Sequence, residues 1–150
     1  MAASNVVIRP LGVDERADWE PLWKGYQTFY ETVIPDATSA VTWARLHDPA
    51  EPMHALGAYV DGRLRGIVHY IFHRSCWTLG DYCYLQDLFV AETERGRGLG
   101  RALIGAVEEC ARAAGASRIY WLTHETNTAA RVLYDRLADR SGFIQYRKLF

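Results

Sequence analysis

The sequence predicts a mixed α/β fold in which one central sheet is covered by helices on both faces. Two observations support this class. Strand-like and helix-like patterns of apolar residues follow one another in the order strand, two helices, three strands, helix, strand, helix, strand. The pair Asp61-Gly62 also separates two strand-like segments, as in a type I′ hairpin. Because no linker or internal repeat interrupts this order, residues 1–150 are expected to form one domain.

The first half of the chain is expected to form a strand, two helices and the hairpin. The first strand is a short apolar run that ends at Pro10. Both helices place apolar residues at spacings of three and four, and the second ends before Asp48-Pro49, which disfavours a helix. The expected bounds are Val6 to Arg9 for the strand, Asp14 to Tyr30 and Asp36 to His47 for the helices, and His54 to Val60 with Arg63 to His73 for the hairpin.

The second half is expected to alternate strands with helices. Its first helix gathers apolar residues on one face and ends before Gly115, a candidate for the left-handed residue that closes a helix. Asn127 stands at the cap position of the next helix. The expected bounds are Tyr82 to Val90, Ser117 to Thr123 and Phe143 to Lys148 for the strands, and Leu99 to Ala114 and Thr128 to Leu137 for the helices.

The composition is that of an ordinary soluble globular protein, with 49% hydrophobic and 23% charged residues. A net charge of −1 argues against binding driven by bulk charge, so neither nucleic acid nor membrane is an expected partner. Cys76, Cys83 and Cys110 form no metal-ligand spacing, and His69 and His73 lack a third ligand, so no metal is expected. The cysteines are interpreted as reduced thiols of a cytoplasmic protein.

A basic, glycine-rich turn follows the strand that ends at Val90, and a helix begins at once. Its sequence from Arg95 to Arg101 is Arg-Gly-Arg-Gly-Leu-Gly-Arg. The glycines let backbone N–H groups turn toward an anion, and the helix start adds free N–H donors and a positive dipole end. The dinucleotide fingerprint and the Walker A loop are both excluded because position 101 is Arg. The turn therefore predicts a phosphorylated cofactor, although its arginines could also form a solvated patch.

Two motifs in this order resemble the acetyl-CoA signature of the GCN5-related N-acetyltransferase (GNAT) family. The first is Arg95-x-x-Gly98-x-Gly100, and the second is Asn127-x-x-Ala130-x-x-Leu133-Tyr134, followed by Gly142-Phe143. The run from Tyr84 to Val90 is similar to the diamine acetyltransferase branch, and closer still to fungal Hpa2-like acetyltransferases. The resemblance implies the GNAT fold, a mostly antiparallel twisted sheet whose strands splay at the acetyl-CoA site. It also implies a homodimer.

The resemblance further implies roles for particular residues. Backbone groups of Leu88, Phe89 and Val90 would bind the pantetheine arm of acetyl-CoA. Tyr134 lies two helical turns beyond Asn127 and would protonate the departing thiolate. The alternative for Tyr134 is core packing, and the alternative for Asn127 is simple helix capping. The residues implied in acetyl-CoA binding are Leu88, Phe89, Val90, Arg95, Gly96, Arg97, Gly98, Leu99, Gly100, Arg101, Asn127, Ala130 and Tyr134. The candidates for acceptor binding are Tyr26, Tyr30, Glu31, Gln86 and Asp87.

The sequence leaves the general base open. In the diamine branch a glutamate occupies the position of Gln86, and an amide cannot accept the proton. Strand alternation is expected to turn the adjacent Asp87 to the opposite face. The other candidates are Glu125, His124, His69 and Asp81.

The expected function is acetyl-CoA-dependent N-acetylation of a primary amine by direct transfer in a ternary complex. The acceptor could be a small amine, a polyamine, an amino acid or a protein lysine. Two alternatives stand beside this function. A non-catalytic acyl-CoA-binding or sensing module is supported only by the amide at Gln86, and a different nucleotide-phosphate binder is disfavoured by the spacing of the turn.

Overall fold

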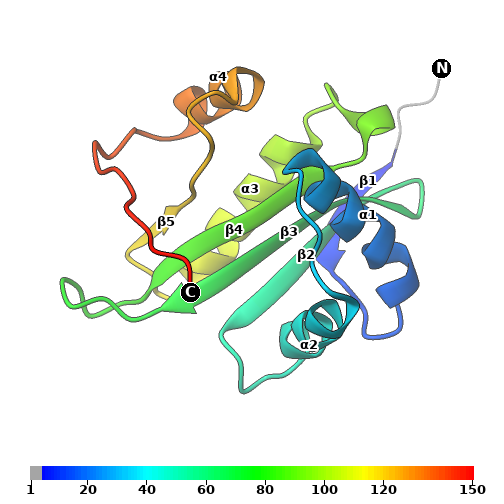
Figure 1. The fold of residues 1–150 in the computed structure, drawn as a ribbon, viewed down its shortest axis with the longest axis horizontal. Helices are drawn as coiled ribbons and strands as arrows, with labels where there is room; N and C mark the ends of the chain where they lie inside the picture. Colours follow the sequence, from blue (N-terminus) through cyan, green and yellow to red (C-terminus); the bar gives the residue numbers. More distant parts are fainter. Residues whose placement is uncertain (1–4) are drawn as a thin grey trace.

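A computed structural model describes residues 5–150, which form a five-stranded sheet in the order β1-β2-β3-β4-β5 (Figure 1). The first four strands are antiparallel in succession, whereas β5 runs parallel to β4. Asp61 and Gly62, with φ of 49° and 80°, make the turn of the β2–β3 hairpin, as predicted. The predicted mixed class and mostly antiparallel sheet are confirmed. The strands are β1 (Val6–Pro10), β2 (Met53–Val60), β3 (Arg63–His73), β4 (Tyr82–Val90) and β5 (Arg118–Tyr120).

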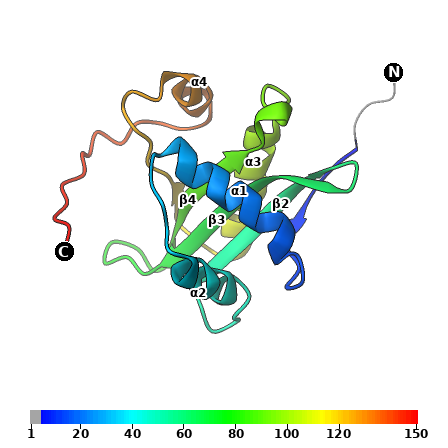
Figure 2. The same ribbon diagram turned by 45° about the vertical axis from the view of Figure 1, so that its right-hand side comes forward.

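Helices cover both faces of the sheet, as the sequence predicts. Figure 2 shows α1 and α2 crossing one face, with α3 behind the sheet. The residues of α3 form one core with β2, β3 and β4, and half-buried residues of α4 pack against this same core. The bounds are α1 (Arg16–Phe29), α2 (Asp36–Leu46), α3 (Leu99–Ala113) and α4 (Thr128–Leu137), with a short 3-10 helix, η1 (Glu92–Glu94), before α3.

Three tryptophans dominate the core on the α1 and α2 face. The ring centroid of Trp19 lies 5.7 Å from that of Trp23 and 4.9 Å from that of Trp43, and Trp19 is fully buried. Helix α1 approaches β4 closely because it carries Gly25 at the contact, where a Cβ atom would lie 2.9 Å from the ring of Phe89. This close packing brings the last turn of α1 over β4.

Two strand predictions differ from the structure. Strand β5 is shorter than the expected 117–123, since its ladder with β4 ends at the pair Tyr84 and Tyr120. The predicted strand Phe143 to Lys148 is wrong: residues 143–150 form no strand, and the tail runs clear of the sheet (Figure 2). An apolar pattern does not by itself pair a segment with a sheet edge, and residues 138–150 form no ladder with any described strand.

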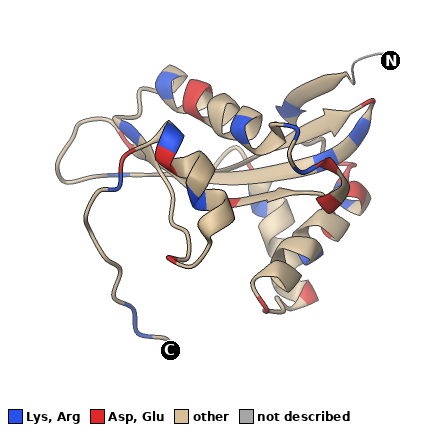
Figure 3. Cartoon of the chain, turned by 90° about the horizontal axis from the view of Figure 1, so that it is seen from above, with Lys and Arg blue, Asp and Glu red and all other residues tan. Residues whose placement is uncertain are grey.

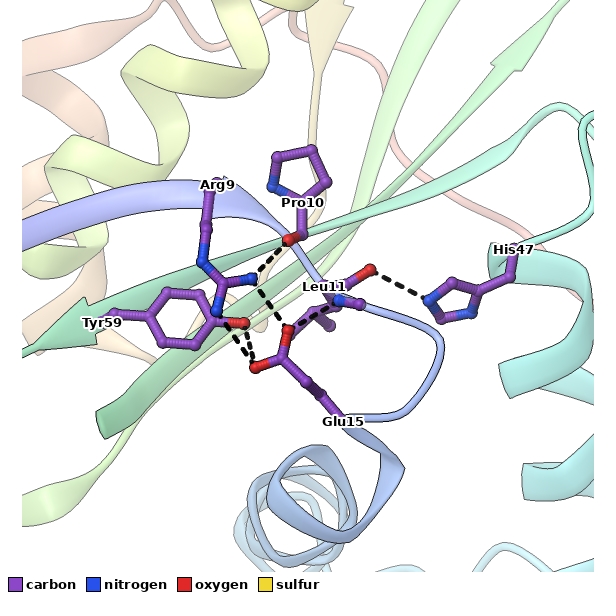
Figure 4. Close-up of polar contacts among 7 residues, drawn as sticks. Arg9, Pro10, Leu11, Glu15, His47 and Tyr59 are labelled. Carbon is purple, nitrogen blue, oxygen red and sulfur yellow. Dashed lines mark hydrogen bonds and ion pairs between the residues drawn. The ribbon is translucent and has the colours of Figure 1, made fainter. Parts of the chain in front are cut away.

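A polar cluster ties the start of the chain to the sheet (Figure 4). The Glu15 carboxylate accepts hydrogen bonds from the guanidinium of Arg9 at 2.8 Å, the N–H of Gly12 at 2.7 Å and the hydroxyl of Tyr59 at 2.9 Å. These donors, Arg9 foremost, lower the pKa of Glu15 to about 2. Nearby, the carbonyl of Leu11 lies 3.0 Å from a ring nitrogen of His47, which links this loop to α2.

Replacing this carboxylate is expected to reduce stability in a pH-dependent way. Glu15→Gln should lower the free energy of unfolding at pH 7 by about 1 kcal/mol, because the charged acceptor of these hydrogen bonds is lost from a cluster that is partly open to solvent. The folded pKa lies below the ordinary 4.5, so the carboxylate contributes stability above that pH. Most of the difference from wild type should therefore disappear as the pH falls from about 4.5 to about 2. Urea unfolding of wild type and variant at pH 7 and pH 3 measures this difference in the free energy of unfolding.

Glu20→Gln is the matched control for that experiment. Glu20 pairs with Arg16 one helical turn away, at 3.7 Å and near the surface. Its loss should change stability by less than about 0.5 kcal/mol. An equal effect of the two substitutions, or a Glu15 effect that is undiminished at pH 3, would contradict the role of the cluster.

Charges of both signs are interspersed over the helices and the sheet (Figure 3). This distribution agrees with the net charge of −1 and gathers no single sign on one face. Within residues 5–150, no helix combines the length and the apolar character that a membrane crossing requires.

Candidate active site

A β-bulge in the middle of β4 determines which side chains reach which face of the sheet. In the ladder with β3, His69 pairs with Asp87 and the next residue, Tyr70, pairs with Leu85, so Gln86 is the extra residue. Leu85 and Leu88 consequently pack on the same α3-side core although they are three residues apart. The prediction that Asp87 points away from the acceptor side is therefore wrong, because the bulge interrupts strict alternation.

Asp87 lies instead on the face covered by α1, where it contacts a buried histidine. Its Oδ2 atom is 3.0 Å from Nδ1 of His69, whose side chain is only 4% exposed. Burial, and then the negative charge of Asp87, raises the pKa of Tyr26 and of Tyr30, and contributes in the same way to the raised pKa of Tyr84. The structure thus surrounds one carboxylate with phenols that stay neutral at physiological pH.

Beside this carboxylate, a small cleft opens where β4 and the chain beyond β5 diverge. Tyr26 and Tyr30 reach it from α1, Gln86 and Leu88 from β4, and Tyr134 from α4. Beyond Tyr84 the outer edge of β4 has no neighbouring strand within residues 5–150. Free backbone groups along such an edge can hydrogen-bond an extended, amide-containing ligand.

At the far end of β4, the glycine-rich turn leads into α3. Gly96 and Gly98 both adopt φ of 81°, and a Cβ atom at either position would have no neighbour within 4 Å. Positive φ, rather than crowding, therefore requires glycine there. No side chain caps α3 at Gly98, so the N–H groups of its first turn have no partner in the helix. Such an open helix start, preceded by flexible backbone, suits a pyrophosphate group.

The three arginines of this turn differ in their contacts. Arg97 forms an ion pair with Glu94 at 3.1 Å. Arg95 donates to the carbonyl of Val90 at 3.2 Å and lies over the ring of Phe89. Arg101 is exposed, and its side chain has no hydrogen bond or ion pair to other described residues. Of the three predicted phosphate contacts, Arg101 thus has the side chain that is free to meet a ligand.

Helix α4 places two further predicted residues beside the cleft. Tyr134 packs edge-on against Trp121, with ring centroids 5.6 Å apart, and burial raises its pKa. Asn127 occupies the cap position as predicted, but its side chain donates to the hydroxyl of Thr123 at 3.2 Å and does not cap the helix. Ala130 lies on the same half-buried side of α4.

Three of the remaining candidates, Glu31, Asp81 and Glu125, do not line the cleft. Glu31 follows α1 with φ of 53° and an exposed side chain, and it does not line the cleft. Asp81 is paired with Arg74 at 3.2 Å, and Glu125 is exposed in the loop before α4. The ring of His124 packs at a tilt against that of Tyr30, with centroids 5.6 Å apart, and so lies near the cleft.

Sequence reasoning missed the apolar wall of the cleft and the partner of His69. Leu85, Ile104, Trp121 and Leu122 line the cleft without belonging to either motif. The indole N–H of Trp19 donates to Nε2 of His69 at 3.0 Å. No local pattern could have found that contact, because it joins residues 50 positions apart.

Comparisons with known proteins agree with this architecture. The sequence model of the acetyltransferase (GNAT) family matches residues 19–138. The D-amino-acid N-acetyltransferase HPA3 of Saccharomyces cerevisiae is 31% identical over 150 residues, which cover 99% of this chain and 93% of that protein. The thialysine N-epsilon-acetyltransferase of Caenorhabditis elegans is 30% identical over 100 residues, which cover 63% of this chain and 62% of that protein.

Solved structures share the fold. The aminoglycoside N-acetyltransferase AAC(6′)-Iy, solved in complex with CoA, superimposes with a TM-score of 0.83 at 21% identity. The match covers 98% of this chain and 97% of that one. At this identity the similarity concerns the arrangement of strands and helices.

Proposed function

Because this chain belongs to the acetyltransferase (GNAT) family, we propose that it acetylates the primary amine of an amino acid and that Asp87 receives that amine. Membership makes the chain an N-acetyltransferase with acetyl-CoA as cosubstrate. The observation that carries the acceptor site is the bulge at Gln86, which brings the Asp87 carboxylate to the side of Tyr26 and Tyr30, beside the cleft.

The chemistry of this site favours a single cationic amine. An alkyl ammonium group, with a pKa of roughly 10.4, is charged at neutral pH. A carboxylate attracts that charge, and the faces of nearby phenol rings add cation–π attraction. Among residues 5–150, Asp87 is the carboxylate whose charge acts on these phenols; Asp81 is paired with Arg74, and Glu31 does not line the cleft. A polyamine would need further carboxylates for its other ammonium groups.

An amino acid also carries a carboxylate, which needs a donor. His124, which packs against Tyr30, places an imidazole beside the cleft that can supply one. The relatives named above act on D-amino acids and on thialysine, both of which are amino acids with free amines. This chemistry supports an amino acid over a peptide-bound lysine, which has no free α-carboxylate because that group forms a peptide bond.

In the proposed mechanism, Asp87 holds the ammonium group and accepts its proton, directly or through water. The neutral amine then attacks the thioester that acetyl-CoA supplies. Backbone N–H groups at the free edge of β4, around Leu88, donate to the oxygen on which charge develops. The Tyr134 hydroxyl donates a proton to the departing thiolate and regains one, directly or through water, from the nitrogen as it becomes an amide; its raised pKa, which keeps the phenol protonated, is consistent with this role.

The residues that would hold acetyl-CoA are those of the free β4 edge and the turn. Leu88, Phe89 and Val90 would bind the pantetheine arm through their backbone, with Asn127 and Ala130 of α4 on its other side. The turn from Arg95 to Arg101 would hold the pyrophosphate, chiefly through N–H groups of Gly96 to Gly100 and the side chain of Arg101.

Turnover on a panel of amines tests this function. CoA release should be fastest with free amino acids, of which D- and L-forms and thialysine are included, and slower with spermidine and lysine peptides. Preference for a peptide would favour a protein acceptor, and binding of acetyl-CoA with no turnover on any amine would favour a sensing module instead.

Tyr134→Phe tests the acid in the same assay. Loss of the hydroxyl should lower kcat by about 10²-fold, because the thiolate then leaves without a proton donor. The affinity for acetyl-CoA should change by less than about threefold, since the ring still packs against Trp121. An unchanged kcat would mean that Tyr134 only packs in the wall of the cleft.

We also propose that the chain forms a homodimer through its C-terminal segment and that it acts in the cytoplasm. Phe143, Ile144 and Tyr146 are at least 76% exposed, an apolar concentration that is unusual on a monomer surface. The outer edge of β5 has no strand partner within residues 5–150 and offers a ladder that a second copy could extend. Sedimentation velocity of wild type and of Ile144→Asp measures the oligomeric state. The free cysteines suit a reducing compartment.

A further inference from the structure

We propose that Trp19 locks His69 in one neutral tautomer, so that His69 holds the Asp87 carboxylate in its charged, base-competent form. This inference rests on the proposed role of Asp87 and adds two positioning residues behind it. The three side chains come from three elements, α1, β3 and β4, and form one continuous chain of hydrogen bonds.

The direction of each hydrogen bond follows from the indole. An indole nitrogen can only donate, so Nε2 of His69, 3.0 Å away from Nε1 of Trp19, must accept and carries no proton. The proton of the neutral imidazole is then on Nδ1. That N–H points to Oδ2 of Asp87 at 3.0 Å, and the carboxylate accepts it.

The same contact opposes the charged form of His69. A second proton on Nε2 would face the indole N–H, and two donors would then oppose each other in a buried place. Trp19 is fully buried and His69 is 3% exposed, so neither can turn toward water to relieve this clash. A neighbouring carboxylate ordinarily favours imidazolium. Trp19 counteracts that tendency, so His69 remains a neutral donor.

The groups around the carboxylate agree with this arrangement. Tyr26 of α1, Tyr30 directly after that helix and Tyr84 of β4 all have a raised pKa, so none of these phenols adds a second negative charge beside Asp87. Trp23 presents its ring to His69 edge-on at 5.1 Å but donates its own N–H to Ser39 at 3.0 Å. Asp87 thus keeps its negative charge, and its second oxygen is available to the amine. The proton taken from the amine cannot pass to His69.

Trp19→Phe and Trp23→Phe form a matched pair of variants. Both replace a buried tryptophan of α1 next to His69 and remove one indole hydrogen bond, but only the first removes the donor to Nε2. Nitrogen-15 NMR of the histidine rings reads the tautomer directly and needs no turnover. In wild type and in Trp23→Phe, His69 should remain the Nδ1–H tautomer from pH 5 to pH 8.

Trp19→Phe removes the donor that opposes a proton on Nε2, so His69 of this variant should be able to take up a second proton. The protonated ring then competes with the amine for Asp87, so kcat/KM should acquire an added ionisation and fall roughly tenfold per pH unit below it. Trp23→Phe should keep the wild-type profile, which separates this effect from general loss of packing.

Two outcomes would overturn the inference. One is a wild-type His69 that carries its proton on Nε2, or that is doubly protonated at pH 7. The other is the same pH profile for both tryptophan variants. Failure of the proposed function gives a different result, namely full activity of Asp87→Asn while His69 still shows the Nδ1–H tautomer.

Discussion

Asp87→Asn is expected to lower kcat/KM for the amine acceptor by about 10²- to 10⁴-fold, the range ordinarily lost with a general base. The amide keeps the shape of the carboxylate and can still accept from His69, but it neither attracts an ammonium group nor takes up its proton. The affinity for acetyl-CoA should change by less than about threefold, because no predicted cofactor contact involves this side chain. Steady-state release of CoA and calorimetric binding measure the two quantities.

Two further variants make this result specific. Asp81→Asn removes a carboxylate of the β3–β4 loop that pairs with Arg74, and it should leave kcat/KM within about twofold of wild type. Adding Gln86→Glu to Asp87→Asn places a carboxylate where the diamine branch has one. Recovery of activity in this double variant would show that a carboxylate at position 86 can serve the same amine, whereas full activity of Asp87→Asn alone would mean that the assignment of Asp87 is wrong.

Gly98→Ala is expected to weaken acetyl-CoA binding by about tenfold. At φ of 81° an alanine costs roughly 1 to 2 kcal/mol, so the turn shifts toward other conformations and its N–H groups lose their alignment. A Cβ atom there has no protein neighbour within 4 Å, which separates this effect from damage to the core. Calorimetric titration with CoA and with acetyl-CoA measures the loss.

Gly105→Ala provides the control. Gly105 lies within α3, where a Cβ atom also has no neighbour within 4 Å but φ is not positive. Alanine should stabilise the helix by up to about 1 kcal/mol and leave cofactor affinity unchanged. Equal affinity of the Gly98 and Gly105 variants would mean that the turn does not bind the pyrophosphate.

Most of the fold could be predicted because its signals are local. The periodicity of apolar residues located the helices, and Asp61-Gly62 located the hairpin turn with its two positive φ angles. The two errors concern pairing between distant segments. The ladder of β5 stops at Tyr120, and Phe143 to Lys148 finds no edge, since strand propensity does not state which partner is available.

The candidate site, too, could be predicted where its residues are contiguous in sequence and not where they come from distant segments. The turn from Arg95 to Arg101 is contiguous in sequence, so its spacing alone could identify it. The orientation of Asp87 could not be predicted, because it depends on an extra residue that becomes visible only in the ladder with β3. The contact of His69 with Trp19 likewise requires the packing of α1 on the sheet.

The bulge shifts the alternation of side chains along β4 by one residue. Before Gln86 the odd-numbered Cys83 and Leu85 face α3, whereas after it the even-numbered Leu88 and Val90 do. Relatives that lack the extra residue would therefore present their acceptor carboxylate one column away in a sequence alignment. Equivalent residues in this strand are to be matched by the face that they occupy. Deletion of Gln86 should therefore leave a regular ladder, in which Asp87 still pairs with His69 and each downstream side chain keeps its face of the sheet.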